Sequence, residues 1–288
     1  TVEMFPKARI PYGTWGSSYF PAWQMSPIAE VNIGQFAGES MNRIMSLRGV
    51  SVQALEYMII GSTIPWHYKF WTAPVVANCM GNRIPGFHAE QACATGLQAM
   101  VLGAAEVQGG GQDVVGVLTF DRTSDSPVGV FPERRSYERT QAIGDVWDNF
   151  GFDPSTGGAM ITCAGTAARK YKLDRAVVDE LAFHRYEQYF AARDSGWLAE
   201  RVCVPLELLN MQGRSMGVVD KDAGIRKITM PALRAMFEMD TCVTGGGQTH
   251  ASDGMACMLV TTPERAKELS PRPEIDIQLL GKCEIRTQ

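Results

Sequence analysis

The chain of 288 residues is 45% hydrophobic and 20% charged, which is the balance of a soluble globular protein with one large or two modest domains. Its formal net charge of −4 includes no basic block, so neither nucleic acid nor an anionic membrane is an expected partner. No apolar run approaches the roughly 20 residues that a membrane-spanning helix needs.

The seven cysteines are odd in number, scattered along the chain and without a C-x-x-C pair. This pattern favours neither a disulfide framework nor a zinc site, so we expect no metal in the chain. The first residues also lack the basic-then-apolar order of a signal peptide. Together these features predict a protein of the reducing cytoplasm.

Hydrophobic periodicity predicts alternating strands and helices in the first 120 residues. In chain order we expect a strand over 2–9, a Gly/Ser-rich turn over 13–18, a helix over 27–48, a strand over 55–61, a helix from 74 to 80, a short strand near 82–87, a helix over 97–107 and a buried strand over 114–120. Such alternation is typical of an α/β layered domain.

The alternation stops at about residue 121 and resumes after about residue 240. Between these points the sequence predicts an irregular segment and two helices, one over 158–171 and one that begins after the N-cap Asp174. Two further strands are expected over 255–262 and 275–280. We therefore predict one α/β domain, residues 1–120 and 241–288, interrupted by a partly helical insertion over 121–240.

Cys93 is the strongest candidate for chemistry because it lies where a short strand turns into a helix. Unpaired N–H groups and the positive end of the helix dipole favour a thiolate at such a place. The small neighbours Ala92, Ala94 and Gly96 leave room for a substrate. The alternative interpretation, a small buried cysteine in a strand, does not account for this turn.

Four segments resemble the thiolases, in the order that this family has them. The run Ala8 to Gly16 resembles the opening strand and turn, and Cys93-Ala94-Thr95-Gly96 resembles the nucleophile motif Cys-x-Ser-Gly, with Thr95 in the place of Ser. The insertion resembles the loop domain that covers coenzyme A. The stretch from Thr244 to Gly254 resembles the family's Gly-rich segment that ends in Asn-Asp-Gly.

The resemblance implies the fold of one thiolase half, a layered α-β-α domain with a loop-domain insertion. The second half of a thiolase carries Asn-Glu-Ala-Phe, Gly-His-Pro and Cys-x-Gly-Gly-Gly motifs, and none of them occurs in these residues. The expectation is therefore a subunit of a heteromeric thiolase, whose partner carries the C-terminal half with the catalytic His and the second Cys. A small zinc-bearing acyl-CoA-binding protein is a further partner in some thiolase-like systems.

The implied reaction is acyl transfer, in which Cys93 attacks a 3-oxoacyl-CoA and free coenzyme A then takes the acyl group; the reverse is Claisen condensation. Coenzyme A is a substrate here. By position in the family pattern, Arg226 would lie near the adenine nucleotide, Thr249 would hydrogen-bond the pantetheine and Met160 would lie near the acyl group. His250 occupies a Gly place close to the pantetheine path.

Two other functions remain open on the sequence. A ketoacyl or hydroxymethylglutaryl synthase also uses a Cys at a strand-to-helix turn, but generally lacks so long an insertion. A non-catalytic thiolase-like protein would bind acyl-CoA or lipid, or act as a scaffold, and the retained Cys93 argues against it. The aromatic cluster over 66–71 fits either an acyl pocket or a subunit contact.

Overall fold

The computed structural model describes residues 3–124, 126–132, 141–145 and 147–284. The chain divides into two compact units. The first unit comprises residues 1–125, 198–224 and 252–287, and the second comprises residues 126–197 and 225–251. The first unit contains Cys93.

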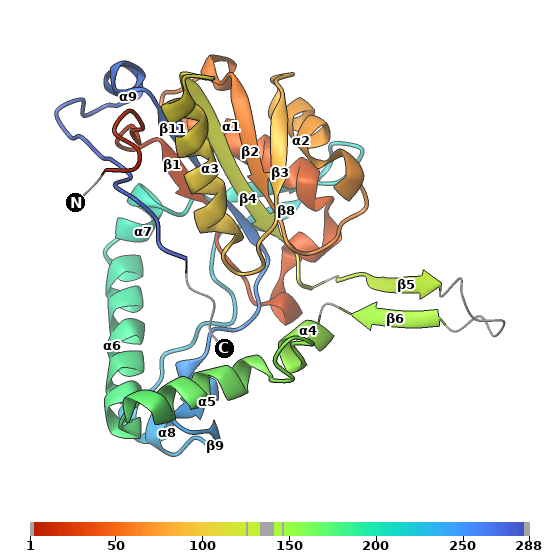
Figure 1. The fold of residues 1–288 in the computed structure, drawn as a ribbon, viewed down its shortest axis with the longest axis vertical. Coiled ribbons are helices and arrows are strands. Elements are labelled where there is room, and N and C mark those ends of the chain that lie inside the picture. The colour runs from red at the N-terminus through yellow and green to blue at the C-terminus, as the bar shows by residue number, and fades with distance from the viewer. Residues whose placement is uncertain (1–2, 125, 133–140, 146, 285–288) are drawn as a thin grey trace. The chain divides into compact units, whose positions relative to one another are not determined.

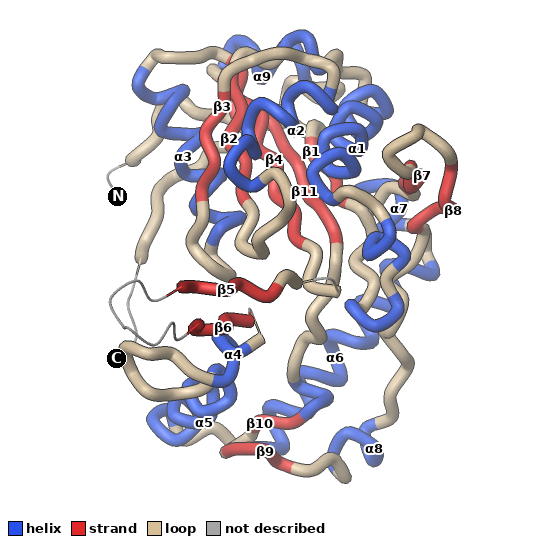
Figure 2. The backbone as a smooth tube through the Cα atoms, turned by 90° about the vertical axis from the view of Figure 1, so that its right-hand side faces the viewer, coloured by secondary structure: helices blue, strands red, loops and turns tan. Residues whose placement is uncertain are grey.

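A five-stranded sheet forms the centre of the first unit, with the strand order β1-β11-β4-β2-β3 (Figures 1 and 2). The strands are β1 (Trp15–Ser17), β2 (Tyr57–Gly61), β3 (Gly86–Ala89), β4 (Val114–Asp121) and β11 (Gly254–Thr261). Strands β2, β3 and β4 are parallel, whereas β11 runs antiparallel to both β4 and β1. The carboxyl ends of β2, β3 and β4 therefore meet at one edge of the sheet.

Helices cover both faces of this sheet, as Figure 1 shows. Helix α3 (Thr95–Gly109) contacts β2, β4 and β11, and its Ala99 and Ala104 pack in one core with Val115 and Val117 of β4. On the opposite face α1 (Ile33–Leu47) and α2 (Thr72–Met80) form a second core. These two layers around a sheet confirm the predicted α-β-α architecture.

The beginning of the chain differs from the expected pattern. The strand predicted over 2–9 is wrong: Arg9 makes isolated bridges to Thr261 and Gln278, and the first strand, β1, lies within the predicted turn over 13–18. A glycine in that strand is required by close packing, because a Cβ on Gly16 would lie 2.7 Å from Ile44. The Gly/Ser composition that suggested a turn thus reflects a strand pressed against α1.

Two other predicted elements differ from the structure: one helix is shorter than expected and one strand is absent. The helix predicted over 27–48 begins as a 3-10 turn, and α1 starts only after Asn32, whose side chain accepts a hydrogen bond from Gln35 N at 3.0 Å. The strand predicted over 275–280 is also wrong, because only Gln278 pairs there, as an isolated bridge. Helix α9 (Pro263–Leu269) precedes this segment.

The second unit is largely helical. Its helices are α4 (Asp148–Gly151), α5 (Met160–Tyr171), α6 (Arg175–Asp194) and α8 (Met230–Arg234), and its strands are β5 (Val128–Pro132), β6 (Gln141–Asp145), β9 (Glu238–Asp240) and β10 (Val243–Thr244). Asp174 is the N-cap of α6, as predicted, and accepts a hydrogen bond from Ala176 N at 2.7 Å.

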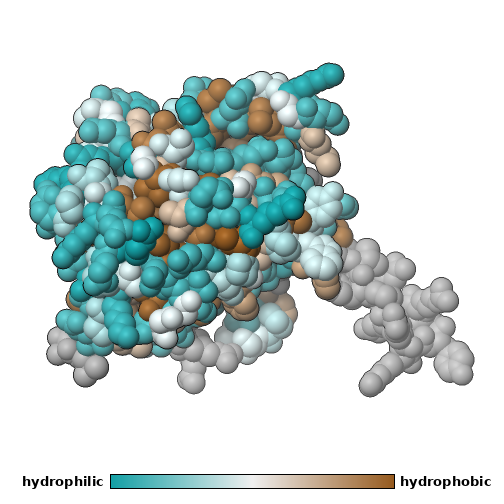
Figure 3. Space-filling model, turned by 90° about the horizontal axis from the view of Figure 1, so that it is seen from above, coloured by the Kyte–Doolittle hydropathy of each residue, from teal (hydrophilic) through white to brown (hydrophobic). Residues whose placement is uncertain are grey.

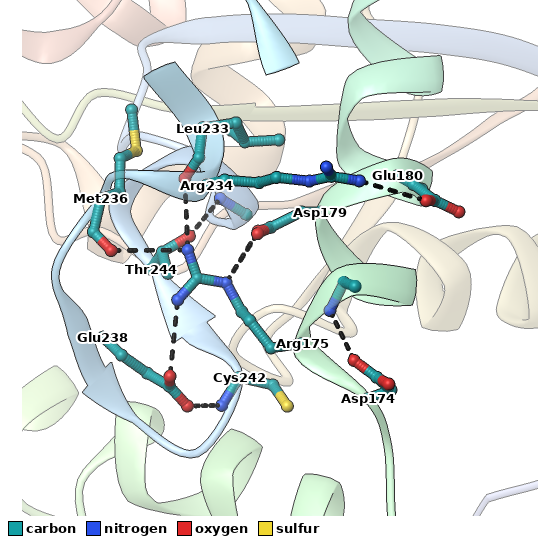
Figure 4. A network of polar contacts seen from close by, with 12 residues as sticks. Asp174, Arg175, Asp179, Glu180, Leu233, Arg234, Met236, Glu238, Cys242 and Thr244 are labelled. Carbon is teal, nitrogen blue, oxygen red and sulfur yellow. Dashed lines mark hydrogen bonds and ion pairs between the residues drawn. The ribbon is translucent and has the colours of Figure 1, made fainter. Parts of the chain in front are cut away.

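A charged network built around Arg175 holds α6 to α8 and to the segment that follows it (Figure 4). Its Nε donates to both oxygens of Asp179, at 2.9 and 2.8 Å, and Asp179 is only 2% exposed. The remaining guanidinium nitrogens reach the carbonyl oxygens of Leu233 and Met236 and the carboxylate of Glu238. A buried carboxylate is thus matched by a cation with its hydrogen bonds satisfied, which is the condition for burying such a pair.

Residues 198–224 lie within the predicted insertion but group with the first unit. They contain the end of α7 (Trp197–Arg201) and the hairpin of β7 (Leu206–Leu209) and β8 (Ser215–Val219). The side chains of Leu206, Leu208 and Val219 are buried in the core beside α1. The boundaries at 121 and 240, and a role of the insertion in covering coenzyme A, stay predictions.

The face of the molecule drawn in Figure 3 mixes hydrophilic side chains with smaller hydrophobic areas. Such mixing is ordinary for a folded protein, because apolar atoms contribute much of any protein surface. Within the described part of the chain, no helix is long and apolar enough to cross a membrane.

Candidate active site

The turn that carries Cys93 connects β3 to α3 at the carboxyl edge of the sheet. Its Ala92 has a φ of 44°, in the left-handed region that residues other than glycine seldom adopt. Ala94 is the N-cap of α3, and no side chain caps this helix end. Cys93 is exposed, directly after Ala92 and two residues before the helix. The predicted strand-to-helix position of this thiol is therefore what the structure shows.

Thr95 fixes the shape of this turn. Its Oγ1 accepts a hydrogen bond from Gln91 N at 2.8 Å and lies 2.7 Å from the carbonyl oxygen of Ala92, to which it donates. The side chain is 5% exposed and packs on Gly61, where a Cβ would lie 2.6 Å from Thr95 Cγ2. The hydroxyl that stands in the Ser place of the family motif thus closes the loop on both sides of Cys93.

A pocket of about 230 Å³ opens beside the thiol. Small residues shared among β2, the turn, α3 and β11 make up much of its lining, with two aromatic rings and four polar side chains. The lining residues are Phe20, Gly61, Ala92, Cys93, Thr95, Gly96, Thr119, Phe120, Asp121, Ser252, Gly254, Met255 and Ala256. A substrate atom can therefore approach Cys93 without displacing a large side chain.

Asp121 brings an ionisable carboxyl group into this pocket. Its Oδ1 accepts hydrogen bonds from the backbone N–H groups of Thr63 and Ile64, both at 2.8 Å. Burial raises the pKa of Asp121 to about 6, although these two hydrogen bonds and the charge of Lys69 act in the opposite direction. The pocket therefore holds a carboxyl group that titrates just below neutral pH. No role is predicted for Asp121 from the sequence, although an acidic residue at the end of a buried strand is a recognisable feature of such a site.

His88 is not among the described residues that line the pocket. Its Nε2 lies 3.0 Å from Ser62 Oγ, and its pKa is lowered first by burial and then by the charge of Lys69. A neutral imidazole that is hydrogen-bonded to Ser62 fits a structural role. Its place outside the pocket lining argues against His88 as the base for Cys93.

The remaining cysteines separate clearly by exposure. Cys203, Cys242 and Cys257 are buried, and burial raises the pKa of each thiol, in Cys257 to about 12. A buried thiol that resists ionisation is a poor nucleophile. Besides Cys93, only Cys163 and Cys283 are exposed, and neither lines the pocket.

Asp253 anchors the opposite wall of the pocket. It is 0% exposed, and its carboxylate accepts hydrogen bonds from the backbone N–H of Ser124 at 3.0 Å, from the Ser124 hydroxyl and from the Thr123 hydroxyl. This arrangement ties the segment after β4 to the start of β11. The Asp-Gly pair that carried part of the family resemblance therefore has a structural purpose.

The other predicted site residues lie in the second unit. Met160 is the first residue of α5 and is 54% exposed, Arg226 and Thr249 are exposed, and His250 is half-buried. Thr249 Oγ1 donates to the carbonyl oxygen of His250 at 3.2 Å. Their shared contact with coenzyme A stays a prediction. Among the described residues, no group of three or more His, Cys, Asp or Glu side chains is arranged to hold a metal ion.

Comparison with known families decides the affiliation of the chain. The family described as "Thiolase, N-terminal domain" matches residues 24–264. The chain belongs to the thiolase family. The turn that carries Cys93, helix α3 and all the pocket-lining residues except Phe20 lie within the matched region.

Curated thiolase relatives share about a quarter of the residues. The chain is 27% identical to acetyl-CoA acetyltransferase 2 of Arabidopsis thaliana over 183 residues, which cover 62% of this chain and 45% of the relative. It is 25% identical to a probable acetyl-CoA acyltransferase of Staphylococcus aureus over 276 residues, which cover 92% of this chain and 67% of the relative. The chain thus spans less than half of the Arabidopsis protein and about two thirds of the staphylococcal one.

Solved thiolase structures share the fold of the chain. The acetyl-CoA acetyltransferase of Bacillus anthracis superposes with a TM-score of 0.79 at 23% identity, covering 93% of this chain and 68% of that one. Human mitochondrial 3-ketoacyl-CoA thiolase superposes with a TM-score of 0.78 at 20% identity, covering 91% of this chain and 67% of that one. At this identity the likeness establishes the fold, which confirms the predicted thiolase-like architecture.

Proposed function

We propose that Cys93 is the nucleophile of a coenzyme A-dependent acyl transfer, the thiolytic cleavage of a 3-oxoacyl-CoA or its reversal by Claisen condensation. The observation that carries this proposal is an exposed thiol, on a turn fixed by Thr95, that faces a pocket lined by small residues. Membership of the thiolase family supports it. The acyltransferase names of the relatives point to the same reaction class.

The proposed first half-reaction is acylation of the enzyme. The Cys93 thiolate attacks the 3-oxo carbon, the bond between C2 and C3 breaks, and the electron pair stays on C2, which takes a proton to give acetyl-CoA. Cysteine suits this step because it is nucleophilic near neutral pH and its thioester remains reactive. The backbone N–H of Cys93, next to the helix start, is a donor for the developing oxyanion.

The second half-reaction transfers the acyl group to coenzyme A. The thiol of free coenzyme A loses its proton and attacks the Cys93 thioester, and the Cys93 sulfur leaves and is reprotonated. Both halves need an acid-base group for the thiol proton and one for the proton at C2. We propose that a catalytic His and a second Cys of a partner subunit supply these groups. Two facts support a source outside these residues: none of the described residues lining the pocket is a His, and the chain carries no Gly-His-Pro sequence.

Arg226, Thr249, Met160 and His250 are the residues that we propose for coenzyme A and the acyl group. Their support is their position in the family pattern, together with the exposure of Arg226, Thr249 and Met160. Substitution of Arg226 by Gln is expected to raise the KM for coenzyme A and to leave kcat unchanged. The proposed contact with the nucleotide is the same in the ground state and in the transition state. Its loss therefore weakens the binding of coenzyme A without slowing the chemical step.

The experiment that tests the function is acylation of the protein purified from its native source with whatever polypeptide accompanies it. The protein is mixed with an acyl-CoA, and the intact mass of the chain is measured over time. An added acyl mass that disappears in Cys93→Ala and persists in Cys163→Ala supports the proposal, because Cys163 is the matched exposed thiol outside the pocket. A chain that binds acyl-CoA but never acquires the mass would indicate the non-catalytic binding or scaffold role instead.

The proposed partner is tested in the same preparation. A co-purifying polypeptide with Gly-His-Pro and Cys-x-Gly-Gly-Gly motifs, required together with Cys93 for cleavage of a 3-oxoacyl-CoA, is the expected result. If the chain cleaves 3-oxoacyl-CoA at full rate without such a polypeptide, the partner proposal is wrong and the acid-base groups belong to the same chain.

A further inference from the structure

The alternation of side chains along β4 places Asp121 on the same face of the sheet as α3. Val115 and Val117 pack with Ala99 and Ala104 of this helix, whereas Val114 and Leu118 lie in the core on the opposite face. Because successive side chains of a strand point to opposite faces, the odd-numbered residues all face α3. Asp121 therefore ends the strand beneath the N-terminal side of α3, where Cys93 lies.

One oxygen of Asp121 is committed to the fold and the other is not. Oδ1 accepts both backbone hydrogen bonds, from Thr63 and from Ile64, and so holds the loop after β2. Within the described residues, Oδ2 has no hydrogen-bond partner, while the side chain lines the pocket with Cys93. The carboxyl group thus presents an acceptor to whatever fills this space.

The threonine hydroxyls of the pocket already have partners. Thr95 Oγ1 is bonded within the nucleophile turn, and Thr119 Oγ1 donates to the carbonyl oxygen of Ala256 at 3.4 Å. Most of the other lining residues are glycine, alanine or apolar. Asp121 is therefore a polar group in this lining from which a ligand can gain a hydrogen bond without breaking one.

Asp121 and Cys93 do not contact each other through a hydrogen bond among the described contacts, although both line the pocket. Its volume of about 230 Å³ is that of about eight groups the size of a water molecule, at roughly 30 Å³ each. An acyl group on Cys93 with a few non-hydrogen atoms can fill this space and bring its far end to Asp121.

An alkyl chain would fit this arrangement poorly. It would displace water from Asp121 Oδ2 and offer no hydrogen bond in return, and a buried polar group without a partner costs free energy. A hydroxyl group at the same place donates to the carboxylate and restores the lost bond. A site built to bind a hydroxyl can reject the analogue that lacks it strongly.

We propose that Asp121 is a specificity-determining residue, which selects acyl groups that carry a hydrogen-bond donor such as a hydroxyl over plain alkyl acyl groups of the same size. The inference rests on the proposed acylation of Cys93. It names the substrate class of that site as short, hydroxylated acyl-CoA thioesters. The raised pKa of Asp121 agrees with this role, because it reflects a carboxyl group that is only partly hydrated.

The test compares three acyl-CoA thioesters of equal size: 3-hydroxypropanoyl-CoA, which ends in a donor, methoxyacetyl-CoA, which has only an acceptor, and butanoyl-CoA, which has neither. Rates of Cys93 acylation are measured by intact mass on the protein with any co-purifying polypeptide. Each rate is divided by that of the same thioester with free cysteine in solution, which removes intrinsic reactivity. We expect the normalised rate for 3-hydroxypropanoyl-CoA to exceed that for butanoyl-CoA about tenfold or more.

Asp121→Asn separates the role in specificity from the role in the fold. The amide oxygen of Asn can still accept the hydrogen bonds from Thr63 and Ile64, while the amide nitrogen turns a donor toward the pocket. We therefore expect methoxyacetyl-CoA to overtake butanoyl-CoA, and the advantage of 3-hydroxypropanoyl-CoA to fall several-fold. Asp113→Asn is the matched control, the same change at the exposed start of β4, and should leave all three ratios unchanged.

Each outcome decides between the proposals. If no thioester acylates Cys93, the proposed function fails before specificity is tested. If all three acylate at equal normalised rates, the function stands and the role of Asp121 is refuted. If Asp121→Asn keeps the wild-type order, the preference arises elsewhere. Should that variant fail to fold, Asp121→Glu replaces it: the carboxylate advances by one methylene, so the normalised rate for butanoyl-CoA must fall more than that for 3-hydroxypropanoyl-CoA.

Discussion

Asp179 in the second unit is buried and Asp121 in the first unit is partly buried, and the two carboxylates have opposite kinds of hydrogen-bond partner. Asp179 lies against Arg175, which donates to both of its oxygens, and the hydrogen bond raises the pKa of that arginine. Asp121 has backbone N–H groups on one oxygen and a pKa raised to about 6. A carboxylate with a dedicated cation is a structural element, whereas one with a free acceptor oxygen beside the proposed nucleophile is suited to a ligand.

The largest effect that this comparison predicts follows removal of the cation from Asp179. Arg175→Met should lower the free energy of unfolding by about 3 kcal/mol or more, because it leaves a buried carboxylate unpaired. Hydrogen exchange should rise throughout residues 160–194 and 230–244. Arg234→Met is the control, since the pair of Arg234 with Glu180 is exposed and should contribute less than about 0.5 kcal/mol. Equal effects of the two substitutions would show that Asp179 does not depend on its partner.

The next effect concerns Thr95, whose hydroxyl is as fully engaged as Asp179. Thr95→Val leaves Gln91 N and the carbonyl of Ala92 without this partner, so we expect a loss of about 2 kcal/mol in stability. Because the turn positions Cys93, the acylation rate should fall roughly 10- to 100-fold. Thr95→Ser keeps the hydroxyl and should retain most of the rate. Similar losses in the two variants would mean that the methyl group, and not the hydroxyl, holds the turn.

Much of the first unit was predictable because its signals are local. The buried run 114–120 and the apolar spacing after Cys93 each specify one element, and the strand-to-helix turn between β3 and α3 follows from them. The N-cap Asp174 is predictable for the same reason, since a side chain that accepts its neighbour's N–H acts within three residues.

Where the prediction failed, tertiary contacts determine the secondary structure. Strand β1 has only three residues, and its Gly16 is set by the approach of Ile44, so its composition resembles a turn. The apolar run 275–280 forms no strand, because its pairing with the start of the chain is limited to one isolated bridge, between Gln278 and Arg9, and single hydrogen bonds to the carbonyl oxygens of Ile277 and Leu280. The role of Asp121 depends on the same kind of information. Its place beside Cys93 comes from the parallel arrangement of β2, β3 and β4, which a single sequence does not contain.

A smaller effect, which concerns Asp121 alone, is a pH dependence of stability. The pKa of Asp121 is higher in the folded protein, about 6, than its ordinary value of 3.8, so the folded state binds the proton more tightly. The contribution of Asp121 to stability must therefore fall as the pH rises from about 4 to about 6, and stay reduced above that. Asp121→Asn, which cannot ionise, should be more stable than the wild type by about 1–2 kcal/mol at pH 8 and no more stable at pH 4. Urea unfolding at both pH values measures this. A difference that is the same at both would show that the charge on Asp121 carries no cost.

The smallest effect concerns the two charges near Asp121. The charge of Lys69 lowers its pKa and that of Glu90 raises it, and the two side chains pair with each other at 2.6 Å. Lys69→Met should therefore raise the pKa of Asp121 above about 6, and Glu90→Gln should lower it. Both side chains are partly exposed, so each change should amount to a few tenths of a pKa unit and shrink with added salt. Carboxyl carbon NMR follows the titration, with Asp121→Asn to assign the signal. If the two substitutions leave the pKa in place, burial and the two backbone hydrogen bonds set it, and the pocket can be redesigned around Asp121 without regard to the surface.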